Sequence, residues 1–452
     1  TAQEKSRAAW GGSGEKDVTF YSILHKKTGD TEFAGYDNYW AEGKVAALTK
    51  DGKEADVLKA GDIGEIILTK TAFYAQSGGQ VSDKGKITSK HFEAEVEEVI
   101  KPVGNLFVHK VKVLKGDISA GALVSSEINI EHRKQTARHH TATHLLQKVL
   151  RDYFGGHITQ AGSLVADNYL RFDFTHFNAV KKEDLIRIET KVNAAIRENI
   201  PVCAENMDID KARKAGAMAL FGEKYGDVVR TVSVKSGDEI FSMELCGGTH
   251  IARTGDIGFF KIVSESSVAA GVRRIEAVAG LAAEEYVLKG ESVAHKVAEI
   301  LNVSKEELLE RAQKFIADYK KLGQDLADLR SRLISGDIVN YVKLAKDVKG
   351  MKFLALSVDD VETKVLRDMS DKIKERMKSA VIIIVSKSGG KASFIVSVTP
   401  DYMEKGVNAG KIAKDFAADI NGSGGGKPDF AQGGSKDLSK IDDAVKTAEK
   451  YL

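Results

Sequence analysis

The sequence predicts a multidomain α+β protein, and three patterns support this class. Residues 17–130 consist of short alternating runs punctuated by glycine, aspartate and asparagine, which is typical of a small β-barrel or sandwich. Residues 131–280 mix amphipathic helices with isolated strands, and residues 281–335 are helical and rich in charge. Residues 336–452 alternate strands with helices around a glycine-rich stretch, which predicts an α/β domain.

The composition is that of an ordinary globular protein. Its 452 residues, 42% apolar and 29% charged, are enough for two to four domains. The 67 basic and 65 acidic residues leave a net charge of +2, so any nucleic-acid contact must come from local patches. Two cysteines argue against a disulfide framework and for a reducing compartment. The longest apolar run, residues 380–385, is too short to span a bilayer, and we expect a cytoplasmic protein without membrane contact.

The polar residues 1–16 are expected to be a linker, the remnant of a preceding helical domain. Within the barrel region, Thr71–Gln80 places two aromatic residues before Ser77, Gly78, Gly79 and Gln80. The aromatic rings could stack on a nucleotide while the glycine amides approach a phosphate. Alternatively, the segment is a hairpin turn packed against the barrel. Barrel strands are predicted at residues 35–39, 43–48, 64–68, 92–99 and 106–113.

Two histidines on a predicted helix offer half of a metal site. The helix begins near Arg133 and ends at Gly155 and Gly156, a pair suited to a left-handed cap. His140 and His144 are four residues apart, so their side chains lie on one face, about one turn apart. An isolated pair of this kind more often belongs to a surface or a core, so further ligands are needed to indicate a metal.

Cys246 and His250 repeat the four-residue spacing around a Gly-Gly hinge. A lone cysteine is usually a small buried side chain, which is how we interpret Cys203. Zinc proteases need a glutamate after the first histidine of their motif, and the threonine at position 141 argues against a peptidase. Three imidazoles and one thiolate suit Zn²⁺, so the sequence predicts a zinc site at His140, His144, Cys246 and His250.

The other elements follow from hydrophobic periodicity. The middle region should contain a helix at residues 182–198 and strands at residues 169–174, 228–234, 241–246, 257–263 and 272–278. Next, a heptad pattern predicts a short coiled coil or helical hairpin that acts as a spacer. Its apolar positions are Leu308, Phe315, Tyr319, Leu322, Leu326, Leu329 and Leu333.

The terminal region should contain strands at residues 353–358, 381–385 and 392–398 and helices at residues 362–379 and 407–420. Its glycine-rich residues 421–434 include Lys427, but Pro428 stands where a P-loop requires serine or threonine. The stretch could let its backbone approach nucleic acid, form a mobile loop at a dimer contact, or be a plain flexible loop.

Five motifs resemble the C-terminal half of alanyl-tRNA synthetase and follow that family's order over nearly the whole chain. They are Phe73-Tyr74 with Ser77–Gln80, His140–Leu146, His157–Gln160 with Gly162–Leu164, Cys246–Gly258 and Gly271–Glu276. The departures are small. Ala72 and Gln76 replace frequent family residues of the aromatic turn, and Ser423 interrupts the terminal glycine run. These changes affect the rigidity of the turn and the backbone freedom of the glycine run, not the metal site.

The resemblance implies an editing fragment. In that family the middle domain hydrolyses mischarged seryl- and glycyl-tRNA(Ala), with zinc at the four positions named above and Gln160 near the aminoacyl group. The terminal domain binds tRNA(Ala) and helps to form a homodimer, and residues 1–16 match the end of the tRNA-recognition region. No adenylate-forming domain precedes Asp17, so we expect no aminoacylation from this piece.

The resemblance also suggests where tRNA is contacted. Contacts are expected from Lys427 and from the turn that contains Ser77, Gly78, Gly79 and Gln80. Arg273 and Arg274 are adjacent on a strand and point to opposite faces. One is expected to contact acceptor phosphates and the other a buried carboxylate such as Glu276, and which does which is left open.

Two mechanisms of ester hydrolysis are open. A zinc with three protein ligands and a water could supply hydroxide. With four protein ligands the tetrahedron is closed, and zinc would organise the pocket or bind the substrate amine, while a water held by Gln160 or the tRNA ribose hydroxyl reacts. We favour the closed site, with Thr141 rather than Thr143 binding the serine hydroxyl. The alternatives are a non-catalytic tRNA-binding and dimerisation module with a structural zinc, and a free-standing long alanyl-tRNA editing protein.

Overall fold

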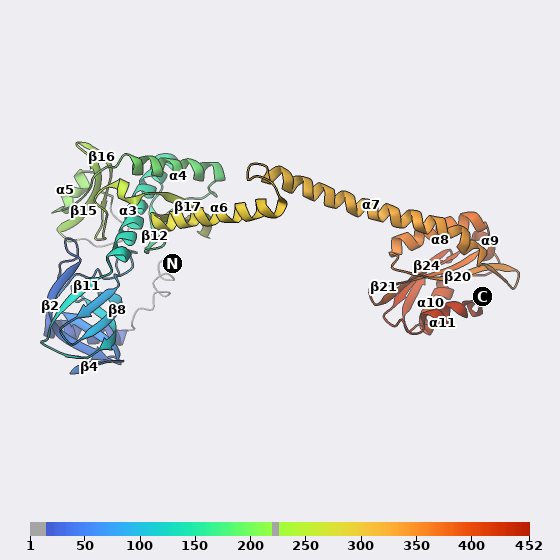
Figure 1. The fold of residues 1–452 in the computed structure, drawn as a ribbon, viewed down its shortest axis with the longest axis horizontal. Coiled ribbons are helices and arrows are strands. Elements are labelled where there is room, and N and C mark those ends of the chain that lie inside the picture. The colour runs from blue at the N-terminus through green and yellow to red at the C-terminus, as the bar shows by residue number, and fades with distance from the viewer. Residues whose placement is uncertain (1–14, 219–225) are drawn as a thin grey trace. The chain divides into compact units, whose positions relative to one another are not determined.

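The structure is a computed structural model that describes residues 15–218 and 226–452. The chain divides into two compact units, with the boundary between Lys296 and Val297. Both units combine helices with sheets, so the predicted α+β class is confirmed (Figure 1). The finer division into five domains stays a prediction.

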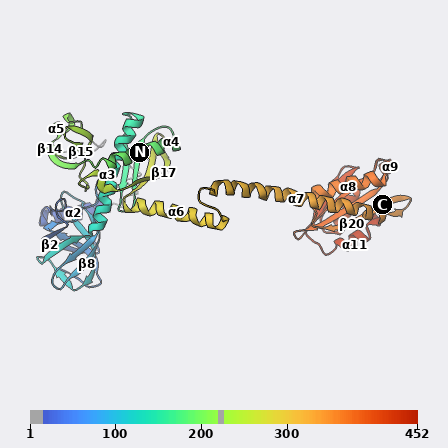
Figure 2. The same cartoon turned by 45° about the horizontal axis from the view of Figure 1, so that its top comes forward.

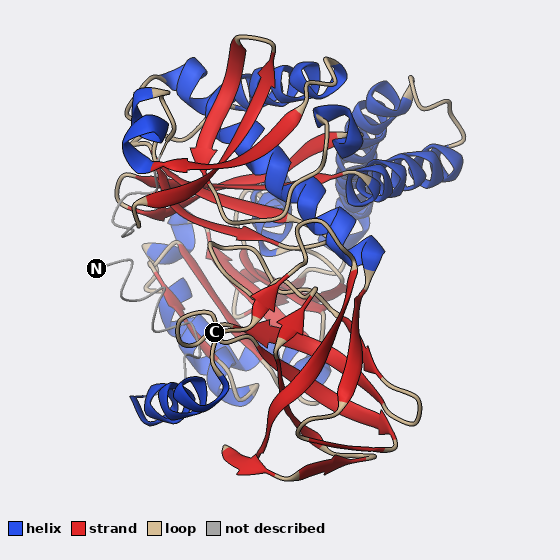
Figure 3. Cartoon of the chain, turned by 90° about the vertical axis from the view of Figure 1, so that its left-hand side faces the viewer, coloured by secondary structure: helices blue, strands red, loops and turns tan. Residues whose placement is uncertain are grey.

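A closed β-barrel forms the first part of the N-terminal unit, as the alternating pattern predicts (Figure 3). Its strands pair in the order β11–β7–β8–β9–β5–β2, and β11 pairs again with β2 to close the ring. Inward side chains such as Ile66, Phe73 and Phe92 form one buried core. The strands are β2 (Trp40–Lys50), β5 (Ile63–Leu68), β7 (Gly85–Thr88), β8 (Glu93–Ile100), β9 (Val108–Lys115) and β11 (Leu123–Ile128).

Two features around the barrel differ from the prediction. Helix α2 (Glu15–Thr28), which we did not predict, packs Tyr21 and Leu24 against the barrel. The predicted strand at residues 35–39 is wrong, because these residues turn closely past Ala72, whose carbonyl oxygen would lie 2.0 Å from a Cβ at Gly35. Residues 1–14 of the predicted linker lie outside the described residues. Short strands complete the region: β1 (Glu32–Phe33), β3 (Lys53–Ala55), β4 (Val57–Lys59), β6 (Lys70–Thr71) and β10 (Asp117–Ser119).

Helix α3 (Ile130–Phe154) runs from the barrel into the middle of the unit (Figure 2). It begins at Asn129, whose side chain accepts a hydrogen bond from the backbone N–H of His132. It ends at Gly155, whose positive φ of 108° favours glycine, as the sequence predicts, although its ψ of 178° lies outside the αL region. It packs against α4 (Lys182–Arg197) and an antiparallel sheet of β12 (Gln160–Val165), β13 (Leu170–Thr175), β18 (Val272–Ala279) and β17 (Phe260–Ala269).

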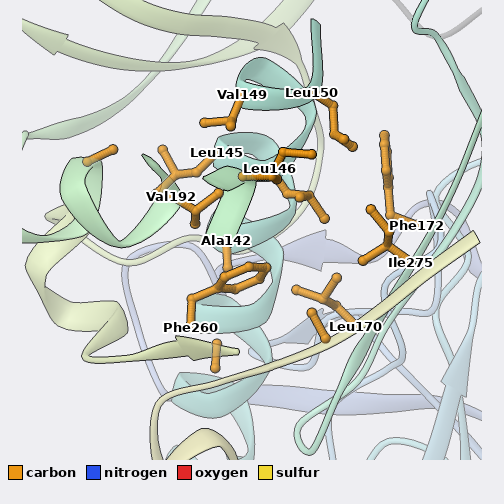
Figure 4. Packing of buried hydrophobic residues seen from close by; sticks show 14 of the residues in the cluster. Ala142, Leu145, Leu146, Val149, Leu150, Leu170, Phe172, Val192, Phe260 and Ile275 are labelled. Carbon is orange, nitrogen blue, oxygen red and sulfur yellow. The ribbon is translucent and has the colours of Figure 1, made fainter. Parts of the chain in front are cut away.

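The apolar face of α3 forms the centre of this packing (Figure 4). Ala142, Leu145, Leu146 and Val149 recur at helical spacing and pack in one buried cluster with residues such as Phe172. Truncating such a leucine to alanine typically costs about 2–5 kcal/mol. Because this face is held by the core, the opposite face of α3 is fixed in rotation, and that face carries the two histidines.

A second antiparallel sheet leads to the other two predicted ligands. It consists of β14 (Val202–Asp208), β15 (Val228–Ser236) and β16 (Glu239–Leu245), and β16 ends directly before Cys246. Short helix α5 (Ile209–Lys214) follows β14, and η1 (Thr254–Ile257) occupies the start of the predicted strand at residues 257–263. The loop between β16 and η1 therefore carries both Cys246 and His250.

Helices α6 (Leu281–Leu301) and α7 (Leu308–Lys343) occupy the predicted helical region. Phe315, Tyr319, Leu322 and Leu326 of the heptad pattern are between 51% and 72% exposed within this chain. The coiled coil therefore stays a prediction. The side chain of Leu333 lies outside the described residues.

The C-terminal sheet has the order β19–β20–β21–β22–β24–β23. Its glycine-rich stretch is a hairpin and neither of the two predicted loops, because β23 (Ser423–Gly426) and β24 (Phe430–Ser435) pair. The approach of its backbone to nucleic acid stays a prediction. A Cβ at Gly433 would lie 2.4 Å from the Phe394 ring, so glycine allows this close packing. No described helix is long and apolar enough to cross a membrane. The other elements are β19 (Lys346–Val348), β20 (Met351–Asp359), β21 (Val381–Ser388), β22 (Lys391–Val398), α8 (Thr363–Met377), α9 (Pro400–Met403), α10 (Ala409–Asp419), α11 (Ile441–Lys446) and η2 (Ala448–Tyr451).

Candidate metal centre and adjoining cavities

The structure brings the four predicted zinc ligands together. The ligand atoms of His140, His144, Cys246 and His250 all lie within 4.8 Å of one another. The imidazoles of His140 and His144 stack on the face of α3 with ring centres 5.2 Å apart. The Cys246 sulfur lies 3.4 Å from Nε2 of His140 and 3.3 Å from Nε2 of His250.

Each imidazole is oriented by an oxygen at its other nitrogen. The Nδ1 atom of His140 lies 2.6 Å from Oε1 of Gln80, and that of His144 lies 2.5 Å from Oε2 of Glu244. The Nδ1 atom of His250 lies 3.1 Å from Oγ1 of Thr141. Metal-bound histidines almost always make such a contact through the nitrogen that does not bind the metal. The arrangement therefore leaves the three Nε2 atoms as the ligand atoms.

The chemistry of the cluster fits zinc. Both ring nitrogens of His144 are buried without a hydrogen bond of good geometry among the described residues, but Nδ1 lies 2.5 Å from the Glu244 carboxylate. Nε2 is therefore the nitrogen left to bind a metal. Burial opposes the Cys246 thiolate, but the neighbouring His140 and His250 outweigh it and hold the pKa of that thiol well below its usual range. The backbone N–H of Gly248 also points to the sulfur, at 3.4 Å. These features stabilise the thiolate that a zinc ion requires.

Gln80 belongs to this centre and not to a tRNA-contacting surface. Its side chain is 1% exposed, which does not fit the expected contact with tRNA. Besides approaching His140, its Oε1 accepts from the backbone N–H of Thr249, and its Nε2 donates to the Thr249 hydroxyl, both at 2.9 Å. The barrel thereby supports one histidine of α3 and the loop after β16. A Cβ at Gly248 would lie 2.0 Å from Cε1 of His140, so this position requires glycine.

Two residues that sequence reasoning missed hold the Cys246–His250 loop. The Tyr36 hydroxyl donates to the carbonyl oxygen of Gly247 at 2.6 Å. Arg230 lies 4.1 Å above the Tyr36 ring and donates to the carbonyls of Cys246 and Gly248 at 2.8 and 2.9 Å. Tyr36 is 211 residues from Gly247, and no local pattern reports a contact of that range. Glu244 could have been found, because it lies two residues before Cys246 at the end of a strand and so shares its face.

A cavity of about 320 Å³ adjoins the ligands. Gln160, at the start of β12, lines it and donates from Nε2 to the Ser163 hydroxyl at 2.9 Å. Thr143 also lines it, whereas Thr141 is fully buried and contacts His250. The expectation that Thr141 binds the serine hydroxyl therefore does not fit the structure, because this residue supports a histidine instead.

The Ser-Gly-Gly turn joins the barrel to β12. Gly78 and Gly79 have φ of 57° and 84°, and a Cβ at Gly79 would lie 2.4 Å from the Ser163 hydroxyl. The carbonyl of Gly79 accepts from the N–H of Val165 at 2.8 Å. Phe73 is 0% exposed in the barrel core, so the proposed stacking of this ring on a nucleotide is wrong. Ser77 and Gly78 line the cavity beside the metal ligands.

The two predicted arginines are both engaged in ion pairs. Arg273 pairs with Glu265 through contacts of 2.5 and 2.8 Å, and Arg274 pairs with Asp173 through contacts of 2.7 and 2.8 Å. Neither pairs with Glu276, whose carboxylate accepts from Ser264 instead. Lys427 belongs to the C-terminal unit, where it lies exposed in the turn between β23 and β24.

A buried ion pair fixes α3 to the barrel. Arg133, near the start of α3, donates through Nε to Asp83 at 2.8 Å and pairs with it again through Nη2. The guanidinium also donates to the carbonyls of Gly35 and Ala72, and Asp83 accepts from the N–H of Tyr74 at 2.7 Å. This network holds the barrel turn beside the histidine face of α3.

Comparison with known proteins identifies three family profiles. Residues 1–132 match the class II (A) tRNA synthetases, residues 229–276 match the threonyl and alanyl tRNA synthetase second additional domain, and residues 350–452 match the DHHA1 domain. The second profile includes Cys246, His250 and both arginines of β18.

Relatives match all or nearly all of the chain. An alanine–tRNA ligase of Endomicrobium trichonymphae is 65% identical over 453 residues, covering 100% of this chain and 52% of that protein. One of Pelotomaculum thermopropionicum is 42% identical over 432 residues, covering 96% of this chain and 49% of that protein. The C-Ala domain of Aquifex aeolicus alanyl-tRNA synthetase is 31% identical with a TM-score of 0.23, covering 24% of this chain and 96% of that structure. The chain spans about half the length of the curated relatives it matches.

Proposed function

Because the chain belongs to the alanyl-tRNA synthetase family, we propose that it hydrolyses mischarged seryl- and glycyl-tRNA(Ala) at the metal centre. The observation that carries this proposal is the convergence of three oriented imidazoles and a thiolate beside a cavity lined by Gln160. The substrate is an ester between an amino acid and the terminal ribose of tRNA. Its hydrolysis needs a positioned water and stabilisation of the oxyanion that forms.

His140, His144, Cys246 and His250 would hold Zn²⁺, which supplies a Lewis-acidic positive charge in the cavity wall. If all four converging side chains bind the ion, the ligand set would be complete without a water, as in closed zinc sites. The chain's own groups must then position the reacting water. The Gln160 amide nitrogen donates one hydrogen bond to the Ser163 hydroxyl, which orients the amide so that its oxygen can accept a hydrogen bond from this water. The tRNA ribose hydroxyl is a second candidate for the same task.

Serine is distinguished from alanine by its hydroxyl. A site that hydrogen-bonds a substrate hydroxyl rejects an analogue that lacks it far more strongly than an apolar pocket discriminates by size. Thr143 lines the cavity, and its hydroxyl donates to the carbonyl of His139 at 2.8 Å. Its oxygen can therefore accept from the serine hydroxyl, whereas Thr141 does not line the cavity.

The other parts of the chain serve tRNA binding in this proposal. The exposed Lys427 and the glycine-rich hairpin of the C-terminal unit contact tRNA(Ala), together with Ser77 and Gly78 at the cavity mouth. The exposed heptad positions of α7 and the terminal domain provide a homodimer contact, and the protein acts in the cytoplasm. In this proposal the chain has four domains: the β-barrel at residues 17–130, the editing domain at residues 131–280, the helical spacer at residues 281–335 and the tRNA-binding domain at residues 336–452.

A matched pair of cysteine variants tests the proposal. Wild-type protein with one equivalent of zinc should release serine from Ser-tRNA(Ala) but not alanine from Ala-tRNA(Ala). Cys246→Ala should lose both bound zinc and deacylation, whereas Cys203→Ala, the other cysteine, should keep both. If the zinc-loaded wild type releases no serine, the proposed hydrolysis is wrong. The remaining alternative is a tRNA-binding module with a structural zinc, because a closed ligand set would also suit that role.

A further inference from the structure

A second cavity, of about 360 Å³, opens on the barrel beside the metal cavity. Its size lies within the range of ligand sites, about 300–1,000 Å³. Tyr74, Ser77 and Gly247 line both cavities, so the two share a rim. A ligand that crosses this rim would contact both cavities.

The walls of this barrel cavity are aromatic. Phe33, which is half-buried, stacks on Phe107 with ring centres 5.5 Å apart, and meets Tyr36 edge-on at 4.9 Å. Tyr36 is 45% exposed. Such rings stack with nucleobases, because every base presents an aromatic face.

The charge of the cavity suits a phosphodiester next to a base. Among the described residues that line it, Lys101 is the only charged one, and it lies exposed with its Nζ 5.8 Å from the Phe107 ring centre. The larger cavity of about 900 Å³, which Tyr36 also lines, carries the carboxylates of Asp37, Glu205 and Asp256 beside the cationic side chains of Arg133, Lys134, Arg138 and Arg230. The barrel cavity, in contrast, presents Lys101 to an anion without any carboxylate among the described residues of its lining.

We propose that the barrel cavity binds the terminal nucleoside of the aminoacyl-tRNA, with its base against Phe33 and Tyr36 and its 5′ phosphate near Lys101. The ribose then crosses the shared rim at Ser77 and Gly247, which places the ester beside the metal ligands. This inference rests on the proposed hydrolysis for its substrate, but it concerns a separate set of residues. It gives the barrel a direct role in substrate binding.

The test uses the full chain and two matched pairs of variants. Phe33→Leu removes the stacking ring and keeps apolar volume, and Phe92→Leu makes the same change in the barrel core away from the cavity. Lys101→Ala removes the cation, and Lys112→Ala removes an exposed lysine of β9 outside the cavity. Phe33→Leu and Lys101→Ala should each raise KM for Ser-tRNA(Ala) about tenfold with a smaller change in kcat, and the controls should leave KM unchanged.

A second readout does not depend on hydrolysis. A tRNA(Ala) with 2-aminopurine as its terminal base should lose fluorescence on binding the wild type and Phe92→Leu, but not Phe33→Leu. If the wild type hydrolyses Ser-tRNA(Ala) while Phe33→Leu and Lys101→Ala match their controls in KM and fluorescence, the nucleoside site is wrong and the proposed function stands. If the wild type does not hydrolyse the ester, the proposed function fails, and the fluorescence change alone decides the nucleoside site.

Discussion

Removing one partner of the buried Arg133–Asp83 pair should strongly destabilise the N-terminal unit. The Arg133 and Asp83 side chains are 6% and 2% exposed, so Asp83→Ala leaves a guanidinium in the interior without its anion. Breaking such a pair typically costs about 3–5 kcal/mol. Replacing both residues by apolar ones of similar size is often nearly neutral, because no charge is then left buried. The double variant Arg133→Met, Asp83→Leu should therefore recover part of the stability that Asp83→Ala loses, because the N–H of Tyr74 and the carbonyls of Gly35 and Ala72 still lack their side-chain partners.

The assay is urea-induced unfolding, monitored by hydrogen exchange of peptides from the barrel and from α3. Peptide resolution is needed because the two units of the chain need not unfold together. Lys86→Met, which removes an exposed ion pair with Glu93 on the same barrel, is the control and should leave the unfolding midpoint almost unchanged. Equal effects of Asp83→Ala and Lys86→Met would refute the assignment of the buried pair as the anchor between barrel and helix.

Three further predictions concern the centre and the buried histidines. Gly248→Ala should abolish zinc binding measured by metal analysis, because its Cβ would lie 2.0 Å from His140, whereas Gly247→Ala, with its nearest atom 3.9 Å away, should retain the metal. Gln80→Leu should weaken zinc binding about 10–100-fold in a chelator competition, because His140 loses its orienting contact, and an equal loss in Gln76→Leu would contradict this. Burial lowers the pKa of His109 and of His139 to about 4. The unfolded chain therefore takes up protons below pH ~6.5 while the folded chain does not, so stability should fall by about 3 kcal/mol per histidine between pH 6.5 and 4. His109→Gln should flatten the dependence of the urea midpoint on pH, and an unchanged slope would show that His109 is not buried in its neutral form.

The sequence predicted the features that depend only on residues close together in the chain. The spacing of His140 and His144 requires only the geometry of one helix, and the alternation of the barrel strands requires only their pleat. The spacing of Cys246 and His250 named the other two ligands, and the structure brings all four ligand atoms together.

The features that were missed depend on contacts between distant segments. Gln80 meets Thr249 across 169 residues, and nothing near either residue reports that contact. The glycine-rich hairpin was expected as a loop because glycine and proline usually interrupt strands. The Phe394 ring fills the space that side chains would need there, and so makes glycine compatible with a strand.

Gln80 lies in the barrel region, whereas the histidine that it orients, His140, lies on α3. This limits which fragments of the protein can be expected to bind metal. Excising the middle segment without the barrel would leave the His140 ring able to swing and present either nitrogen. Metal binding by the α3 segment therefore depends on the barrel. A mutation anywhere in the barrel that displaces the Gln80 amide should weaken the affinity for the ion.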